Sequence, residues 1–297
     1  RLCHAHAALS QGRIAHSRPF HFSLYSMHMN ISSFHTHTRL CKHATGEPVD
    51  YVRQAAAEGC SALGISDHCP YPDPTWAGSR MTVADVPEYL QLVARARETA
   101  PFPVYWGFEC EWHPGYESWY RDYLRHELGA EYLVYGSHWV SENGEFLYIP
   151  EYPGRDRLIR YANMTVEGIQ SGLYDYIAHP DIFLAGYPHL DETVLSVCRE
   201  IISAAVEAGL PMEINGLGLS RQPIAGDGGS RAPYPVREFW EMAAEAGAII
   251  ICNSDAHRPE DVLKPARNAR RFAEEAGLSV QDPADVLSFV RDNAVRR

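Results

Sequence analysis

Residues 248–257 read AIIICNSDAH, an apolar run that ends in a short polar segment carrying Asp255 and His257. The run predicts a buried strand, and residues two apart on a strand project from the same face. A carboxylate and an imidazole on one face at the end of a buried strand are costly to bury unless they are paired or bound to a metal. The stretch therefore predicts a strand of an α/β fold with a polar site at its carboxyl end.

Strand-like and helix-like segments alternate along the rest of the chain. The other strand candidates are 30–37, 61–68, 104–112, 131–138, 174–180 and 211–216. Helical spacing occupies 50–59, 86–100, 115–129, 155–172, 191–209, 235–247, 259–277 and 283–295. Several of these helices end in a glycine suited to a left-handed cap, at Gly59, Gly129, Gly172, Gly209 and Gly247. Such alternation with short connections is typical of parallel βαβ units.

A closed β/α barrel and an open doubly wound sheet both fit this alternation. The chain has no G-x-G-x-x-G after its first strand and no G-x-x-x-x-G-K-[ST], the glycine-rich signatures of nucleotide-binding open sheets and P-loop proteins. Polar side chains instead gather where the predicted strands end, which is the face on which barrel enzymes place their sites. They are His35, His37, His68, Glu109, His138, His179, Asp255 and His257. We therefore predict a seven-stranded (β/α)7 TIM-like barrel as a single domain.

Composition narrows the class of protein further. The 297 residues are 45% hydrophobic and carry 26 Lys and Arg against 38 Asp and Glu, a net charge of −12, which disfavours a uniformly basic nucleic-acid binder. Residues 1–28 hold five of the 15 histidines without helical or strand periodicity, so we expect a flexible extension before a domain at 29–297. No secretory signal, apolar membrane span or C-x-x-C pair is found, and the seven cysteines favour a reducing cytoplasm.

The strand-end residues have the chemistry of a multinuclear metal site. In His35-Thr36-His37 both imidazoles lie on one side of the strand, so both can approach one ion. Glu109 and Glu111 also share a face, and one of them could bridge two cations, as carboxylates do in hydrolytic sites whose metals lie about 3.5–4 Å apart. We interpret the whole set as ligands of divalent metals.

The motifs, taken in order, resemble a known family. The chain reads F-H-T-H-T with His43 six residues later, S-D-H, G-F-E, G-S-H, A-H-P-D and N-S-D-A-H. These motifs and intervals are similar to those of the PHP (polymerase and histidinol phosphatase) superfamily, and most of all to its histidinol-phosphatase-like branch. DHCPYP, GFECEW and MEINGLGLSR add to the likeness, which covers about residues 30–265.

The resemblance implies a distorted barrel that holds three divalent ions, with Zn, Mn and Fe equally suited to the mixed nitrogen and oxygen ligands. Carried over by position, it implies three ligand sets: His35, His37, Glu109 and Asp255; Glu109, His138 and His179; and His43, His68 and His257. Glu109 would bridge two ions, and Asp67 would orient the loop of His68. The chain departs from the G-S-V-H of many relatives by reading Gly136-Ser137-His138.

The implied reaction is hydrolysis of a phosphate monoester, with L-histidinol phosphate and water giving L-histidinol and phosphate. A hydroxide that bridges two metals would attack phosphorus in line. Arg80 and Arg221 would clamp the phosphate, Glu111 would face the substrate or support a ligand, and His113 would protonate the leaving group or lie at the surface.

Two other functions remain open at this stage. One is a PHP phosphoesterase that acts on a nucleotide or an oligonucleotide end. The other is a metal-storing or metal-sensing protein without turnover, although structural metal sites are usually coordinatively closed. The absence of a basic stripe with interleaved aromatic residues favours a small phosphorylated metabolite over a nucleic-acid polymer, and no membrane partner is expected.

Overall fold

The computed structural model describes residues 31–289, and its centre is one sheet of seven parallel strands. In order across the sheet these are β1 (Ile31–Ser33), β2 (Cys60–Ile65), β3 (Val104–Cys110), β4 (Tyr132–Gly136), β7 (Tyr176–Ala178), β8 (Met212–Asn215) and β11 (Ile250–Asn253). Each lies within a segment expected to be a strand, apart from a one-residue extension of β2. The sheet curls until β1 approaches β11, which confirms the distorted seven-stranded barrel.

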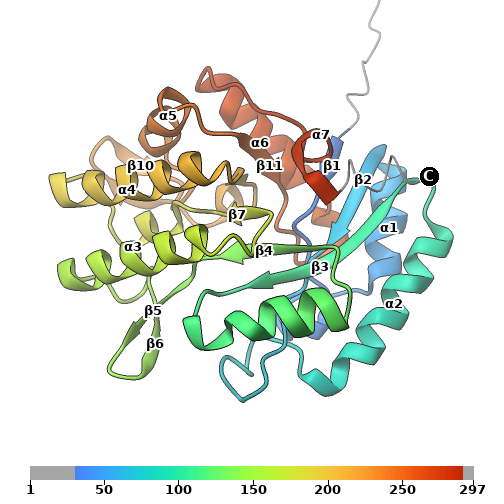
Figure 1. Cartoon of the computed structure of the whole chain (residues 1–297). Helices are drawn as coiled ribbons and strands as arrows, with labels where there is room; N and C mark the ends of the chain where they lie inside the picture. Colours follow the sequence, from blue (N-terminus) through green and yellow to red (C-terminus); the bar gives the residue numbers. More distant parts are fainter. Residues whose placement is uncertain (1–30, 290–297) are drawn as a thin grey trace, which may run out of the picture.

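Helices surround the strands (Figure 1). They are α1 (Pro48–Ala57), α2 (Val86–Thr99), α3 (Arg155–Gln170), α4 (Glu192–Ala208), α5 (Arg237–Glu245), α6 (Lys264–Glu275) and α7 (Pro283–Val286). Short 3₁₀ turns are η1 (Arg39–Cys41), η2 (Val83–Asp85), η3 (Pro114–Tyr116), η5 (Ile182–Ala185), η6 (Gly218–Ser220) and η7 (Pro259–Asp261). The segment expected as one helix over 115–129 is instead η3 followed by a π-helix, η4 (Trp119–Glu127). The five glycines expected to cap helices all have positive φ, between 62° and 80°.

The barrel closes through few backbone hydrogen bonds. The His37 N–H donates to the Ala256 carbonyl at 2.8 Å, and the Ala256 N–H donates to the His35 carbonyl at 3.2 Å. Deeper in the seam a side chain takes over, because the Phe34 N–H donates to the Asn253 side-chain oxygen at 2.8 Å. Direct backbone pairing of β1 with β11 is therefore confined to the carboxyl ends of these strands.

The chain beyond α6 fills the other end of the seam. Gln281 pairs with Ile251, and the Ser32 N–H donates to Asp282 Oδ2 at 3.3 Å. The helix expected over 283–295 is interrupted: α7 ends at Val286, Leu287 has extended backbone angles (φ −70°, ψ 119°), and residues 288–289 are helical again. Leu287 and Phe289 join the apolar cluster inside the barrel.

The interior of the barrel below the polar end is aromatic. Phe289 stacks on Tyr132 with ring centroids 4.8 Å apart, and it contacts Phe34 and Tyr105 edge-on at 5.6 and 5.5 Å. The hydroxyls of Tyr132 and Tyr176 both donate to the Phe34 carbonyl at 2.9 Å. These rings give the polar residues above them a rigid floor.

Two hairpins were not expected from the sequence. β5 (Trp139–Glu142) pairs with β6 (Glu145–Tyr148) just after β4, and β9 (Ile224–Gly226) pairs with β10 (Gly229–Arg231) after β8. The first turn is Asn143-Gly144, with positive φ at both residues, and the second contains Asp227-Gly228. Asn-Gly and Asp-Gly are strong hairpin signals, so the sequence did carry the information. The second hairpin occupies the Gly/Pro-rich stretch 220–235.

Two further expectations concern the cell compartment and the chain start. Between residues 31 and 289 no helix has the length and apolarity to cross a membrane. The six cysteines of the described part, Cys41, Cys60, Cys69, Cys110, Cys198 and Cys252, are free. The extension expected at 1–28 lies outside the described residues.

The position of Phe289 predicts a measurable contribution to stability. Phe289→Ala should lower the free energy of unfolding by about 3–5 kcal/mol, because it leaves a cavity among the rings of the barrel interior. Tyr152→Ala is the control, since Tyr152 is 48% exposed and its loss should change the free energy by less than about 0.5 kcal/mol. Urea denaturation followed by circular dichroism measures both values, and equal stability of Phe289→Ala and the wild type would contradict the interior position of the ring.

Candidate metal centre

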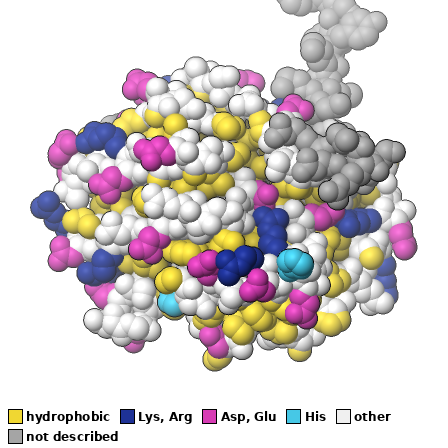
Figure 2. All heavy atoms as spheres, viewed as in Figure 1, with side chains coloured by type: hydrophobic (Ala, Val, Ile, Leu, Met, Phe, Trp, Pro, Cys, Tyr) yellow, Lys and Arg dark blue, Asp and Glu magenta, His cyan; other side chains and the backbone are white. Residues whose placement is uncertain are grey.

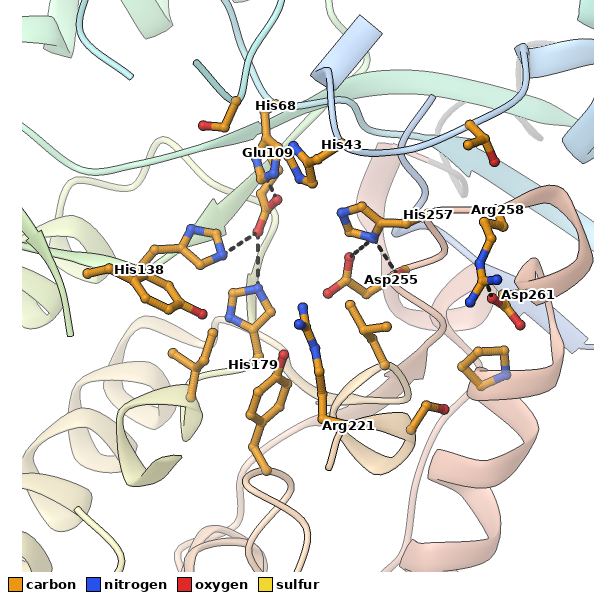
Figure 3. A pocket seen from close by; sticks show the side chains of 18 of the residues that line it. His43, His68, Glu109, His138, His179, Arg221, Asp255, His257, Arg258 and Asp261 are labelled. Carbon is orange, nitrogen blue, oxygen red and sulfur yellow. Dashed lines mark hydrogen bonds and ion pairs between the residues drawn. The ribbon is translucent and has the colours of Figure 1, made fainter. Parts of the chain in front are cut away.

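Glu109 is the centre of the polar end of the barrel (Figure 3). It is the sixth residue of β3, is 1% exposed, and is surrounded by imidazoles. Its Oε2 atom lies 3.4 Å from Nε2 of His35 and 3.4 Å from Nε2 of His37. The same oxygen lies 2.9 Å from Nδ1 of His68.

The second oxygen of Glu109 faces a different pair of histidines. Oε1 lies 3.1 Å from Nε2 of His179 and 3.5 Å from Nε2 of His138. Gly136 makes room for this arrangement, because a Cβ atom there would lie 2.4 Å from Oε1 of Glu109 and 2.7 Å from Cε1 of His138. With glycine two residues before it, His138 can lie close to Glu109. The Glu109 carboxylate thus has the geometry of a bridge between two groups of imidazoles.

Asp255 lies opposite Glu109, at the end of β11. Its Oδ1 atom lies 3.5 Å from Nε2 of His35, 3.2 Å from Nε2 of His37 and 3.4 Å from Nδ1 of His257. Asp255 and His179 both have left-handed backbone conformations, with φ of 54° and 32°. Non-glycine residues rarely adopt this region, and such strain concentrates at functional sites.

A third group of imidazoles lies toward the mouth of the barrel. The ring centroid of His43 is 5.2 Å from that of His68 and 4.9 Å from that of His257. His37 lies beneath them, 4.4 Å from His68 and 4.5 Å from His257. Nδ1 of His43 is 2.8 Å from the Cys41 carbonyl, which leaves Nε2 as the nitrogen available to a ligand.

The donor set fits divalent metal ions. Within the described residues, several groups of three ligand atoms lie within 4.8 Å of one another, among them His35, His37 and Glu109, and His37, His68 and His257. Buried polar atoms normally have hydrogen-bond partners. Here His35 Nε2, both ring nitrogens of His37, His179 Nδ1 and Asp255 Oδ1 are buried and have none. Nitrogen and carboxylate atoms that converge without bonding one another are suited to Zn, Mn or Fe.

The electrostatics of the site keep its carboxylates charged and one imidazole neutral. Burial alone would raise the pKa of Glu109, but His68, His35 and His138 bring it well below the usual value. Burial also opposes ionisation of Asp255, whereas His35 and His37 lower its pKa. Burial and the neighbouring His257 lower the pKa of His37 to about 3. Charged carboxylates and a neutral imidazole are the protonation states in which these groups bind metal.

A buried network behind His35 was not singled out from the sequence. Nδ1 of His35 lies 3.0 Å from both carboxylate oxygens of Glu213. Asn215 and Asn253 donate to the same carboxylate at 2.7 and 3.0 Å, and Asn215 also donates to Asp255 at 3.1 Å. The sequence signal was the Met-Glu-Ile-Asn of β8, where two polar residues share a face of a strand that was expected to be buried.

Glu111 performs a similar function for His138. Its Oε1 atom lies 2.7 Å from Nδ1 of His138 and accepts a hydrogen bond from Arg80 Nη2 at 2.5 Å. Glu111 is 2% exposed and is not among the residues that line the cavity, so it supports a histidine instead of facing substrate. Arg80, also 2% exposed, does reach the cavity, and its Nε and Nη1 atoms have no hydrogen-bond partner.

A cavity of about 810 Å³ opens directly above the carboxylates and histidines. Figure 3 shows Arg221 pointing into it, toward the space between His179 and Asp255. Arg258, Lys264, Tyr148 and Tyr234 also line it and were not expected from the sequence. Of these, Tyr234 is buried and interacts electrostatically with Arg221. The cavity thus places cationic side chains beside the cluster of ligand-type residues.

Two residues expected at the site lie away from the cavity. Asp67 is buried and accepts hydrogen bonds from the Thr38 N–H at 2.7 Å and the Thr38 hydroxyl at 2.6 Å, so it ties the segment after β1 to that after β2. Burial raises its pKa to about 7. His113 accepts a hydrogen bond from the Gly115 N–H at 3.1 Å and packs against Phe146. Neither lines the cavity, so the structure gives no support to His113 as a proton donor.

Comparison with known proteins matches this architecture. Residues 33–216 match the family model described as PHP domain. A Deinococcus radiodurans protein named "Probable histidinol-phosphatase" is 33% identical over 240 residues, which cover 77% of this chain and 86% of the relative. The fold is similar to that of Lactococcus lactis histidinol phosphate phosphatase, solved with Zn, L-histidinol and phosphate, with a TM-score of 0.63 and 15% identity over 84% of this chain and 95% of that chain.

A HisK protein from Listeria monocytogenes has the same fold, with a TM-score of 0.60 and 19% identity over 78% of this chain and 97% of that chain. The family model begins at the last residue of β1 and extends through β8, so it includes Glu109 and the histidines around it. The chain therefore belongs to the PHP domain family, among relatives named histidinol-phosphatase.

Proposed function

We propose that the protein is a metal-dependent phosphoric monoester hydrolase of the histidinol-phosphatase type. It converts L-histidinol phosphate and water to L-histidinol and phosphate. The observation that carries the proposal is the carboxylate of Glu109, whose two oxygens face separate groups of imidazoles at the floor of a cavity that arginines line.

Three ligand sets would hold three divalent ions. The first is His35, His37, Glu109 and Asp255; the second is Glu109, His138 and His179; the third is His43, His68 and His257. When bound, such ions supply positive charge for the phosphoryl oxygens and the Lewis acidity that makes water a nucleophile near neutral pH. Glu213 and Glu111 would hold His35 and His138 in the orientation and tautomer that binding requires.

The chain itself would hold and orient the phosphate. Arg80 is fixed by Glu111 and lies over the rings of Tyr71 and Trp76, 5.6 and 5.3 Å from their centroids. Arg80 lines the cavity and has two nitrogen atoms, Nε and Nη1, without hydrogen-bond partners; together with Arg221 its guanidinium can form charge-assisted hydrogen bonds to phosphoryl oxygens. A rigid guanidinium costs little further ordering when the anion binds.

We propose L-histidinol as the leaving group on the basis of the relatives. The Deinococcus relative has the name of a histidinol-phosphatase, and the Lactococcus protein of the same fold was solved with L-histidinol and phosphate. The zinc in that structure makes zinc a reasonable first metal to test. We further propose that the enzyme acts in the cytoplasm, where free cysteines are stable.

The alternative is a PHP phosphoesterase that acts on a nucleotide or an oligonucleotide end. Figure 2 shows lysine and arginine side chains dispersed among acidic ones on the face in view, without a continuous basic track. A long nucleic acid needs such a track, so a small metabolite remains the better substrate. A metal-storing protein is less consistent with ligand-type residues that open onto a large cavity.

The function is tested by metal analysis and a substrate screen on the purified chain. We expect about three equivalents of Zn or Mn by elemental analysis, phosphate release from L-histidinol phosphate, and slower release from nucleotides. Fewer than two metals and no phosphatase activity after metal loading would contradict the proposal. Preference for a nucleotide would favour the alternative phosphoesterase.

Glu213 offers a test of the network behind His35. Glu213→Gln should weaken metal binding by roughly 10–100-fold, because the amide no longer fixes the imidazole through a charged acceptor. Glu200→Gln, an exposed change on α4, is the matched control. Competition with a chromogenic chelator measures the affinity. If Glu213→Gln and Glu200→Gln bind metal equally well, Glu213 does not tune the centre.

Arg221 offers a test of phosphate binding. Arg221→Ala should lower kcat/KM by about 10–150-fold, the equivalent of about 1.5–3 kcal/mol for a hydrogen bond to a charged group. Arg199→Ala on the exposed side of α4 is the control and should leave kcat/KM unchanged. Steady-state kinetics with metal content measured in parallel separates the two effects. An unaltered kcat/KM in Arg221→Ala would remove Arg221 from the substrate site.

A further inference from the structure

A cysteine lies beside the third group of histidines, and the ligand sets above do not use it. Cys41 is the last residue of η1 and is fully buried. Its sulfur, one ligand atom of His43 and one of His257 all lie within 4.8 Å of one another. The sulfur also forms a second such group with His37 and Asp67. Nitrogen, oxygen and sulfur ligand atoms therefore converge at the mouth of the barrel.

In the protein without metal, burial and the neighbouring Asp67 raise the pKa of the Cys41 thiol to about 12. Lys42 has a left-handed conformation (φ 71°), which turns the chain back over the preceding side chain. The backbone N–H groups of His43 and Ala44 oppose that rise in pKa only in part. A coordinating metal ion deprotonates a thiol outright, and Cys41 lies two residues before the candidate ligand His43.

His37, whose Nε2 atom faces the Glu109 and Asp255 oxygens of the first ligand set, also has an Nδ1 atom without a hydrogen-bond partner. It is fully buried, and neither of its ring nitrogens has a hydrogen-bond partner. It lies in ligand-forming groups with His68 and His257 on one side and with Cys41 and Asp67 on the other. A buried imidazole between two such groups is difficult to explain by packing alone, because both of its polar atoms would be left unsatisfied.

We infer that Cys41 is a sulfur ligand of the third metal ion, together with His43 and His257. The inference rests on the proposed metal centre and changes the ligands of one of its positions. On binding, a sulfur–metal bond forms, the S–H bond breaks, and the proton passes to solvent, so no oxidant or reductant takes part. A thiolate favours Zn or Co over Mn and Mg. The third position therefore differs in metal preference from the other two, whose ligands are nitrogen and oxygen.

Cobalt spectroscopy tests this inference directly. Thiolate ligation of Co²⁺ gives a charge-transfer absorption in the near ultraviolet that nitrogen and oxygen ligands do not give. The full chain is used with Cys3→Ser, because Cys3 precedes His4 and His6 in sequence and could bind cobalt itself. We expect the band in this protein after cobalt loading and its loss in Cys41→Ser. Cys198→Ser is the control, a buried cysteine on α4, and it should keep the band.

Metal retention gives a second readout. Cys41→Ser should lose about one equivalent of zinc to a chelator, with an affinity at least 10–100-fold lower, because removal of a ligand should cost no less than removal of a supporting residue. Cys41→Ala is a second variant in case serine is tolerated poorly, and circular dichroism establishes that each variant is folded. Absence of the band in the cobalt-loaded Cys3→Ser protein, or its persistence without Cys41, would overturn the inference.

The same preparations separate this inference from the proposed function. Phosphatase activity without a thiolate band would reject Cys41 as a ligand and leave the function standing. Failure of the chain to take up any metal would reject both.

Discussion

The structure depends on one buried carboxylate. Glu109 sits with 1% exposure among His35, His37, His68, His138 and His179, and these come from the ends of β1, β2, β4 and β7. An isolated carboxylate in this position would be strongly unfavourable. The histidines offset that cost with their own charge or through shared cations, and Gly136 keeps the space open. Residues from strands that are far apart in sequence therefore converge on the two carboxylate oxygens of Glu109.

A second layer of buried polar groups holds this arrangement in place. Glu213 supports His35, and Glu111 supports His138, each at 2.7–3.0 Å. Arg80 balances Glu111, while Asn215 and Asn253 satisfy Glu213, so each supporting carboxylate has its own donors. A network of this kind is stable only when nearly every member is satisfied. The buried atoms left unsatisfied include His35 Nε2, His37 Nε2 and Asp255 Oδ1, which belong to the candidate ligands of the first ion.

The sequence was informative where side chains suited to metal binding recur at the ends of strands. The seven strands, and the gathering of ligand-type side chains at their carboxyl ends, could be predicted because apolar runs and such side chains coincide in the sequence, as in AIIICNSDAH. Glu213 could not be separated from an ordinary strand residue, because its role depends on which histidine lies behind it in space. The position of Phe289 inside the barrel was missed because helical spacing after Pro283 does not reveal the break at Leu287, beyond which residues 288–289 are helical again. The presence of Arg258 and Lys264 in the cavity wall could not be predicted, because it depends on how the loops fold over the mouth of the barrel. The periodicity of strands and helices carries no information about that loop packing.

The seam at which the barrel closes is also where candidate ligands of the first ion come together. The backbone bonds that join the first and last strands involve His35, His37 and Ala256, and the side chains beside them are His35, His37, Asp255 and His257. Separating the strands at this seam would separate the candidate ligands of the first ion. Ions that bind only the closed form would stabilise it by mass action. Because the seam otherwise relies on Asn253 and the segment around Asp282, such ions would contribute to the fold as well as to the chemistry.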